Sequence, residues 1–177
     1  LGGILVGGQA RRLGGMAKGL IQFNNQSLLK RTIELLTPYC EQVVLLGNPR
    51  GYEGFNLEAL PDSYPEAGPL SGLAAALDVT SREVLIVPCD LPLLTASILS
   101  ELLVHCGTVP VACRGPERTH PLIACYPKWT REIIHKLARQ SRSAHQAFEA
   151  CEGRWVTFES EAPFTNINTP QDLAKMR

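Results

Sequence analysis

Two short runs in the sequence, Gly3–Val6 and Val84–Val87, are apolar throughout instead of alternating between apolar and polar residues. A strand with this pattern is buried on both faces, which is typical of a parallel sheet covered by helices on each side. Further strand candidates, each bounded by Gly, Pro, Asn or Asp, lie at Gln42–Leu46, Thr108–Cys113, Pro121–Cys125 and Trp155–Phe158. The strand pattern therefore favours an α/β fold over an all-helical or all-β one.

Segments with helical periodicity alternate with these strands. They lie at Ser27–Leu36, Leu70–Leu77, Thr95–His105, Thr130–Arg139 and Pro170–Met176, with Ser27 and Thr95 as expected N-caps. This order predicts a doubly wound, mostly parallel sheet flanked by helices in three layers, with some antiparallel character in the later half. The 177 residues contain no internal repeat, low-complexity tract or linker, so we expect a single domain over residues 1–177.

Charge indicates which partners to expect, and cysteine content indicates the cellular compartment. Lys+Arg and Asp+Glu both number 17, so no overall charge attracts nucleic acid or a membrane surface, and we expect neither as a partner. No apolar run approaches the roughly 20 residues of a membrane span, and no secretory signal pattern is present. The 6 cysteines lack zinc-ligand spacing and lie mostly in apolar runs. We expect them to be reduced, in a cytoplasmic protein that is a monomer or a weak oligomer.

Ligands of doubly wound sheets bind outside the carboxyl ends of the strands, where three loops fall at Gly7–Ala17, Pro61–Pro69 and Pro88–Pro92. The first loop is rich in glycine and is followed by Lys18, a combination that suits a triphosphate. It is not a Walker A loop, because Gly19 follows the lysine where a hydroxyl residue is needed, and it lacks the GxGxxG fingerprint. A solvated surface loop is the alternative interpretation.

Asp90 follows the second apolar run directly and is well placed to hold Mg²⁺, which usually takes only one or two protein carboxylates. Its alternative role is to cap the turn between Pro88 and Pro92. In the remaining loop, Asp62 follows a short strand and the residues GPLSGL open a helix. This loop is either a nucleobase or ribose wall or a connection made rigid by its prolines.

Five motifs, in this order, resemble those of the molybdenum cofactor guanylyltransferases, a family with a nucleotide-diphospho-sugar transferase-like, Rossmann-like fold. They are LVGGQARRLGGMAKGL, GPLSGL, PCDLPLL, RTHPLIACY and NINTPQDL, and together they span essentially the whole chain. The resemblance implies an enzyme that transfers GMP from GTP to molybdenum-bound molybdopterin. The products would be molybdopterin guanine dinucleotide and pyrophosphate, and Mg²⁺ would be the cofactor. It further implies contact with a molybdenum-insertion protein or an apo-molybdoenzyme chaperone.

The resemblance also assigns roles to individual residues. It implies that Lys18, Arg12 and Asp90 are catalytic and that Asp90 holds the metal. It places the guanine, the ribose and the triphosphate against Leu5, Val6, Gly7, Gly8, Arg11, Lys18, Asn48, Asp62 and Gly68. It places the molybdopterin beside His120, Asn166 and Asn168.

Two residues depart from the family pattern. Val6 stands where the family usually has Ala, and Ala17 stands where it often has Asp just before the lysine. Two alternative functions stay open, the first because base choice depends on a few pocket contacts and the second because of Ala17. One is a related enzyme that uses CTP or another phosphorylated acceptor, and the other is a non-catalytic adaptor that binds a nucleotide or the molybdenum cofactor.

Overall fold

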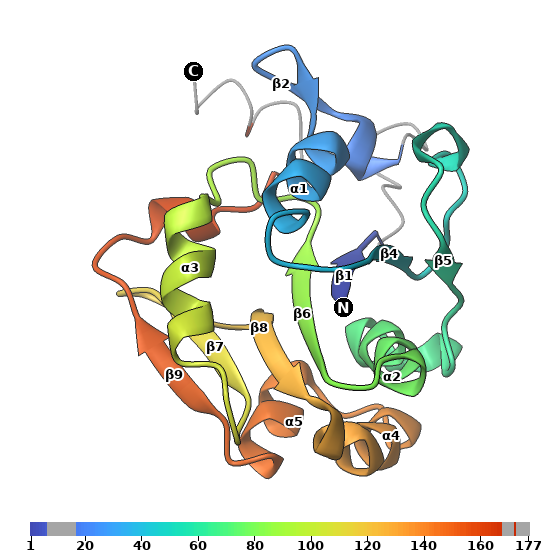
Figure 1. The fold of residues 1–177 in the computed structure, drawn as a ribbon, viewed down its shortest axis with the longest axis vertical. Helices are drawn as coiled ribbons and strands as arrows, with labels where there is room; N and C mark the ends of the chain where they lie inside the picture. The colour runs from blue at the N-terminus through green and yellow to red at the C-terminus, as the bar shows by residue number, and fades with distance from the viewer. Residues whose placement is uncertain (7–16, 168–171, 173–177) are drawn as a thin grey trace.

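The main sheet has seven strands in the computed structural model, which describes residues 1–6, 17–167 and 172 (Figure 1). These strands are β1 (Gly2–Leu5), β4 (Val43–Leu46), β5 (Ala59–Leu60), β6 (Glu83–Pro88), β7 (Val111–Arg114), β8 (Thr119–Pro127) and β9 (Arg154–Thr157). Their order across the sheet is β5-β4-β1-β6-β8-β7-β9. Every neighbouring pair is parallel except the two pairs that β8 makes with β6 and β7. The predicted mostly parallel sheet with a later antiparallel part is confirmed.

The two apolar runs form the neighbouring strands β1 and β6, with Ile4 opposite Val87 in parallel register. Both faces of β6 are buried, since Val84 and Ile86 pack into one core cluster while Leu85 and Val87 pack into the other. Burial on both faces of the strand therefore explains the fully apolar pattern, as predicted from the sequence. A strand covered by helices on both sides has no face that water reaches.

In the described part of the chain, the α-helices that cover the two faces of the sheet are α1 (Leu28–Leu36), α2 (Pro69–Val79), α3 (Ala96–Val104), α4 (Arg131–Arg139) and α5 (Ala144–Ala150). Residues of α2, α4 and α5 share one core cluster with the sheet, and residues of α1 and α3 share the other. Figure 1 shows the same division, with α2, α4 and α5 together on the lower side of the sheet. The three-layer arrangement is confirmed.

The helix starts agree with the predicted caps in position. The Ser27 hydroxyl accepts from the amide of Lys30 at 3.3 Å and so caps α1. Thr95 is the N-cap residue of α3, but its hydroxyl pairs with that of Ser97 instead of with the helix backbone. The predicted terminal helix Pro170–Met176 lies outside the described residues except for Asp172.

Two elements were not predicted although the sequence carries a signal for each. A small hairpin pairs β2 (Gln22–Phe23) with β3 (Gln26–Ser27), and the connecting residues Asn24 and Asn25 adopt φ values of 49° and 61°. Two successive left-handed asparagines are typical of a tight hairpin turn. Helix α5 begins with a capping box in which Ser143 and Gln146 bond each other's backbone amides.

The cysteines depart from the prediction in one pair. Cys106 and Cys125 form a disulfide, so the prediction of six reduced cysteines is wrong for these two. Strand β8 carries Cys125 beneath the end of α3, which brings the two Cα atoms to 6.4 Å although the residues are 19 apart in sequence. The cysteines at 40, 89, 113 and 151 are free. Within the described residues, no helix is long and apolar enough to cross a membrane.

Candidate functional site

The carboxyl ends of β4, β1 and β6 lie side by side, and we call this part of the molecule the strand-end edge. The amide of Val6 donates to the carbonyl of Leu46 at 3.1 Å, and the amide of Cys89 donates to the carbonyl of Leu5 at 3.2 Å. The chain therefore leaves all three strands at one place. Residues that follow these strands in the sequence become neighbours in space, as expected for a ligand site in a doubly wound sheet.

Lys18 and Asp90 meet at the strand-end edge. Lys18 opens a short 3₁₀ helix, η2 (Lys18–Leu20), and its Nζ lies 3.4 Å from Oδ2 of Asp90. Only 21% of the Lys18 side chain and 13% of the Asp90 side chain are exposed, so the ion pair is largely withdrawn from water. A pair in such surroundings interacts more strongly than one on an open surface.

The second carboxylate oxygen of Asp90, Oδ1, is buried and has no hydrogen-bond partner among the described residues. A buried anionic oxygen without a partner is costly, and such groups usually indicate a ligand or an ion. The oxygen fits Mg²⁺, which prefers hard oxygen donors. The described residues hold no group of three or more metal-ligating side chains. Phosphate oxygens and water would therefore have to supply the other ligands of a metal held by Asp90.

Two predicted nucleotide residues can offer only their backbone. The side chain of Val6 packs into the core cluster on the α1 and α3 side of the sheet, and that of Leu5 packs into the opposite cluster. These side chains are 7% and 9% exposed. The extra branch of Val6, relative to the alanine usual in the family, therefore fills core space.

The loops after β4 and β5 place three more predicted residues. Asn48 is exposed, and its Oδ1 accepts from the amide of Arg50 at 3.0 Å. Asp62 is exposed after β5. Gly68 caps the start of α2 with a φ of +55°. Within the described part of the chain, neither Asn48 nor Asp62 is joined to Asp90 by a hydrogen bond or an ion pair, so the structure leaves their predicted role untested.

His120 and Asn166 line one cavity of about 400 Å³. His120 Nε2 lies 2.9 Å from Oε1 of Glu161, and its ring stacks on that of Phe164 with the ring centres 4.6 Å apart. The other oxygen of Glu161 accepts from the amide of Glu117 at 3.2 Å. Burial lowers the pKa of His120 below its usual value, although the bond to Glu161 acts in the opposite direction.

The cavity is connected to the strand-end edge through the backbone. The amide of Ile167 donates to the carbonyl of Asp90 at 2.9 Å, and Ile167 is fully buried. The segment that carries Asn166 is therefore anchored at the residue that is expected to hold the metal. The structure thus brings together two groups of predicted residues, Lys18 with Asp90 and His120 with Asn166. Five others lie outside the described residues: Gly7, Gly8, Arg11, Arg12 and Asn168.

Sequence reasoning missed Glu161, Phe164 and Tyr52. Glu161 and Phe164 contact His120, but they lie at a short 3₁₀ helix (Ala162–Phe164) whose sequence carries no recognisable motif. Tyr52 lies in the polar segment between β4 and β5 and is nevertheless only 3% exposed. Its burial depends on packing between distant segments, for which the local sequence has no signal.

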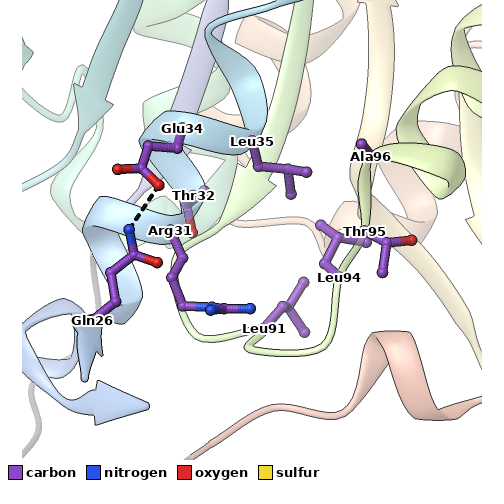
Figure 2. Close-up of a pocket in the computed structure, with 9 residues that line it drawn as sticks. All are labelled: Gln26, Arg31, Thr32, Glu34, Leu35, Leu91, Leu94, Thr95 and Ala96. Carbon is purple, nitrogen blue, oxygen red and sulfur yellow. Dashed lines mark hydrogen bonds between the residues drawn. The ribbon is translucent and has the colours of Figure 1, made fainter. Parts of the chain in front are cut away.

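A separate hollow of about 330 Å³ lies between α1 and the connection from β6 to α3, and Figure 2 shows the residues that line it. Arg31 donates to the carbonyl of Pro92 at 3.0 Å, and Gln26 donates to Glu34 at 2.7 Å. Its main polar groups therefore pair with one another or with the backbone. None of the predicted site residues that the structure describes lines it, so we assign it no role in the site.

The seven-stranded sheet between two layers of helices, with the Lys18–Asp90 pair at its strand-end edge, is an α/β domain of the doubly wound type. A family model described as MobA-like NTP transferase domain matches residues 2–155. The chain belongs to this family, and the resemblance noted in the sequence is confirmed.

Curated relatives match the chain over nearly its full length. A protein of Haemophilus influenzae (strain ATCC 51907 / DSM 11121 / KW20 / Rd) named molybdenum cofactor guanylyltransferase is 34% identical over 181 residues, which cover 97% of this chain and 94% of the relative. A protein of Vibrio cholerae with the same name is 33% identical over 187 residues, which cover 97% of this chain and 88% of the relative.

Solved structures agree on the fold. Molybdopterin-guanine dinucleotide biosynthesis protein A from Archaeoglobus fulgidus superposes with a TM-score of 0.79 at 22% identity, covering 98% of this chain and 95% of that one. The 2-C-methyl-D-erythritol 4-phosphate cytidylyltransferase from Thermus thermophilus superposes with a TM-score of 0.70 at 16% identity, with 98% and 95% covered. At these sequence identities, the superpositions show only that the fold is shared.

Proposed function

We propose that this protein transfers GMP from GTP to molybdenum-bound molybdopterin and releases pyrophosphate. The observation that carries the proposal is Asp90, whose buried carboxylate is paired on one oxygen with Lys18 and open on the other. The names of relatives at 34% and 33% identity support the choice of guanylyl transfer. The family description supports the wider class of nucleotidyl transfer.

In this reaction, the terminal phosphate oxygen of molybdopterin attacks the α-phosphorus of GTP. A new O–P bond forms, the bond between the α-phosphorus and its bridging oxygen to the β-phosphate breaks, and that oxygen leaves with pyrophosphate. The protein contributes mainly position and charge to such a transfer. Asp90 would hold Mg²⁺, and a bound Mg²⁺ would neutralise charge on the triphosphate.

Lys18 supplies a second positive charge at the same place. Its Nζ is held by Asp90 at 3.4 Å, so the ammonium group is oriented before a nucleotide arrives. A preoriented charge costs little reorganisation when negative charge develops on the leaving pyrophosphate. Arg11 and Arg12, which lie outside the described residues, stay predicted as further cations for the pyrophosphate.

The acceptor side of the site is the cavity lined by His120 and Asn166. Polar donors and acceptors in a hollow of this size suit a pterin and its phosphate. The anchor between Ile167 and Asp90 supports this assignment, since it ties the cavity wall to the expected metal position. A cytoplasmic location and delivery of the product through a molybdenum-insertion protein or an apo-molybdoenzyme chaperone stay predictions.

Release of pyrophosphate tests the function. Purified protein with Mg²⁺ and molybdenum-bound molybdopterin should release pyrophosphate from GTP, and GTP should compete better than CTP or ATP for the site. A clear preference for CTP would identify a cytidylyltransferase instead. No release from folded protein that still binds GTP would identify a non-catalytic adaptor.

A further inference from the structure

Tyr52 lies where three segments of the chain meet at the strand-end edge. It belongs to the connection between β4 and β5 and is 3% exposed. Its hydroxyl oxygen Oη accepts from the amide of Gly19 at 3.0 Å, and its side chain belongs to the same core cluster as Cys89. Gly19 follows Lys18 and Cys89 precedes Asp90. Tyr52 is therefore bonded to the neighbour of Lys18 and shares a core cluster with the neighbour of Asp90.

The packing around Tyr52 fixes the segment that carries Lys18. A Cβ atom added to Gly19 would lie 2.9 Å from Cε1 of Tyr52, which is closer than real Cβ contacts, and 3.0 Å from Cβ of Leu29, which is tighter than most of them. A Cβ atom added to Gly51 would lie 3.4 Å from Cβ of Ala17. Residues 17–19 thus rest against residues 51 and 52 on both sides of Lys18. The small Ala17 is part of this close packing.

The Tyr52 hydroxyl joins the connection between β4 and β5 to the segment of Lys18. A phenol oxygen carries lone pairs that accept hydrogen bonds, and here it accepts from the Gly19 amide. Phenylalanine would fill nearly the same space and lose this bond.

We propose that Tyr52 is a positioning residue, which holds the segment of Lys18 in place beside Asp90 for the binding of a metal–triphosphate complex. Lys18 comes from a 3₁₀ helix and Asp90 from the turn after β6, and the Tyr52 hydroxyl ties the 3₁₀ helix to the connection between β4 and β5. The inference rests on the proposed function, because the role of the pair in binding GTP is itself proposed.

The Tyr52→Phe variant tests this role, with Tyr39→Phe as the matched control. The Tyr39 hydroxyl bonds the carbonyl of Ala96 at 3.1 Å and the hydroxyl of Ser100 at 2.7 Å, between α1 and α3, and it contacts no site residue. Loss of a hydrogen bond of typical strength changes an equilibrium or a rate by about tenfold, so Tyr52→Phe should lower kcat for pyrophosphate release by about that factor. It should also raise the Mg²⁺ concentration needed for half-maximal rate. Tyr39→Phe should change neither.

A merely structural role would lower the melting temperature and leave the kinetics, measured well below it, unchanged. Wild-type values of kcat and Mg²⁺ requirement in Tyr52→Phe would therefore overturn the proposal. A titration with Mn²⁺, followed by the loss of its free-ion EPR signal, gives a second readout that needs no turnover. Weaker Mn²⁺ binding by Tyr52→Phe than by wild type would support positioning, and equal binding would overturn it.

The two readouts separate the two proposals. If wild-type protein binds Mn²⁺ but releases no pyrophosphate, guanylyl transfer is wrong, and the Mn²⁺ comparison still decides the role of Tyr52. If wild-type protein does neither, the assignment of a metal to Asp90 is wrong, and the positioning role of Tyr52 is overturned with it.

Discussion

The side-chain nitrogen Nζ of Lys18 lies 3.4 Å from Oδ2 of Asp90, although the two residues are 72 positions apart in the sequence. The parallel pairing of β1 with β6 brings them together, because both strands end at the same edge of the sheet. Most of the polar chemistry of the site depends on this meeting. The first two predictions therefore concern Asp90 and Lys18.

Asp90→Asn should abolish pyrophosphate release while leaving the protein folded. The amide retains the shape of the carboxylate but loses the charge that would hold Mg²⁺, and loss of one preorganised charge of this kind costs about 100-fold or more in rate. The amide also loses the ion pair with Lys18, so the melting temperature of the metal-free protein should fall, as it should in Lys18→Ala, and the rate is the readout that identifies the metal role.

The control for this variant is Asp78→Asn. Oδ1 of Asp78 lies 2.7 Å from Nε of Arg131 and 3.1 Å from Nε2 of His135, so this carboxylate is engaged in contacts between α2 and α4. Its loss should lower the melting temperature and leave the rate unchanged. Equal rates for Asp90→Asn and wild type would contradict the assignment of Asp90.

Lys18→Ala should weaken GTP binding and also destabilise the protein. Removal of the ammonium takes away the ion-pair partner of the Asp90 carboxylate, which is only 13% exposed, at a cost of about 1–3 kcal/mol. Lys30→Ala is the control, because Lys30 is 61% exposed and its pair with Glu34 spans 4.0 Å. An exposed pair of this kind contributes less than about 1 kcal/mol. Urea unfolding and GTP titration measure both effects, and equal stability losses in the two variants would refute the argument.

The sequence was sufficient for the elements whose signals are local. Strands β1 and β6 were predictable because burial on both faces leaves a run with no polar residue. The cap at Ser27 was predictable because its hydroxyl acts within one turn of helix. The resemblance to a family supplied Lys18 and Asp90 as separate site residues, and only the topology of the sheet shows that they touch.

The sequence was insufficient where tertiary packing decides. Tyr52 lies between glycine and glutamate in a segment that reads as a surface loop, and its burial depends on η2 and β6 packing around it. Glu161 reaches His120 across 41 positions of sequence. Cys106 and Cys125 show the same limit, because their spacing matches no motif and α3 and β8 bring them together.

Gly68→Ala should destabilise the protein through its backbone. Gly68 caps α2 with φ +55° and ψ −137°, a conformation that side chains rarely adopt, so the variant should lose about 1–3 kcal/mol of unfolding free energy. Among the described residues other than its two chain neighbours, no atom lies within 4 Å of a Cβ added at this position, so the expected cause is backbone conformation and not a steric clash. Gly54→Ala is the control, since its Cβ also meets open space and its φ is not positive. Similar losses in chemical denaturation for both variants would argue against backbone strain.

The stability of the protein should fall as the pH falls through about 6.5, in part because of His120. Burial has the largest influence on the pKa of His120 and lowers it in the folded state. The hydrogen bond to Glu161 acts in the opposite direction and is outweighed. The unfolded chain therefore binds the proton first as the pH falls, and protonation favours unfolding. The stabilising contribution of the neutral ring is present above the unfolded pKa and is lost below it.

His120→Gln removes this titration while keeping a polar side chain in the cavity. Urea unfolding between about pH 7.5 and 5 should show a shallower decline in unfolding free energy for His120→Gln than for wild type, since one group no longer gains a proton on unfolding. His105→Gln serves as the control, because the His105 side chain is 40% exposed and its Nε2 lies 3.3 Å from Oε1 of Glu101, one helical turn away. If His120→Gln declines as steeply as wild type and His105→Gln, burial of His120 does not set the pH dependence. The source would then lie in other groups that titrate in this range.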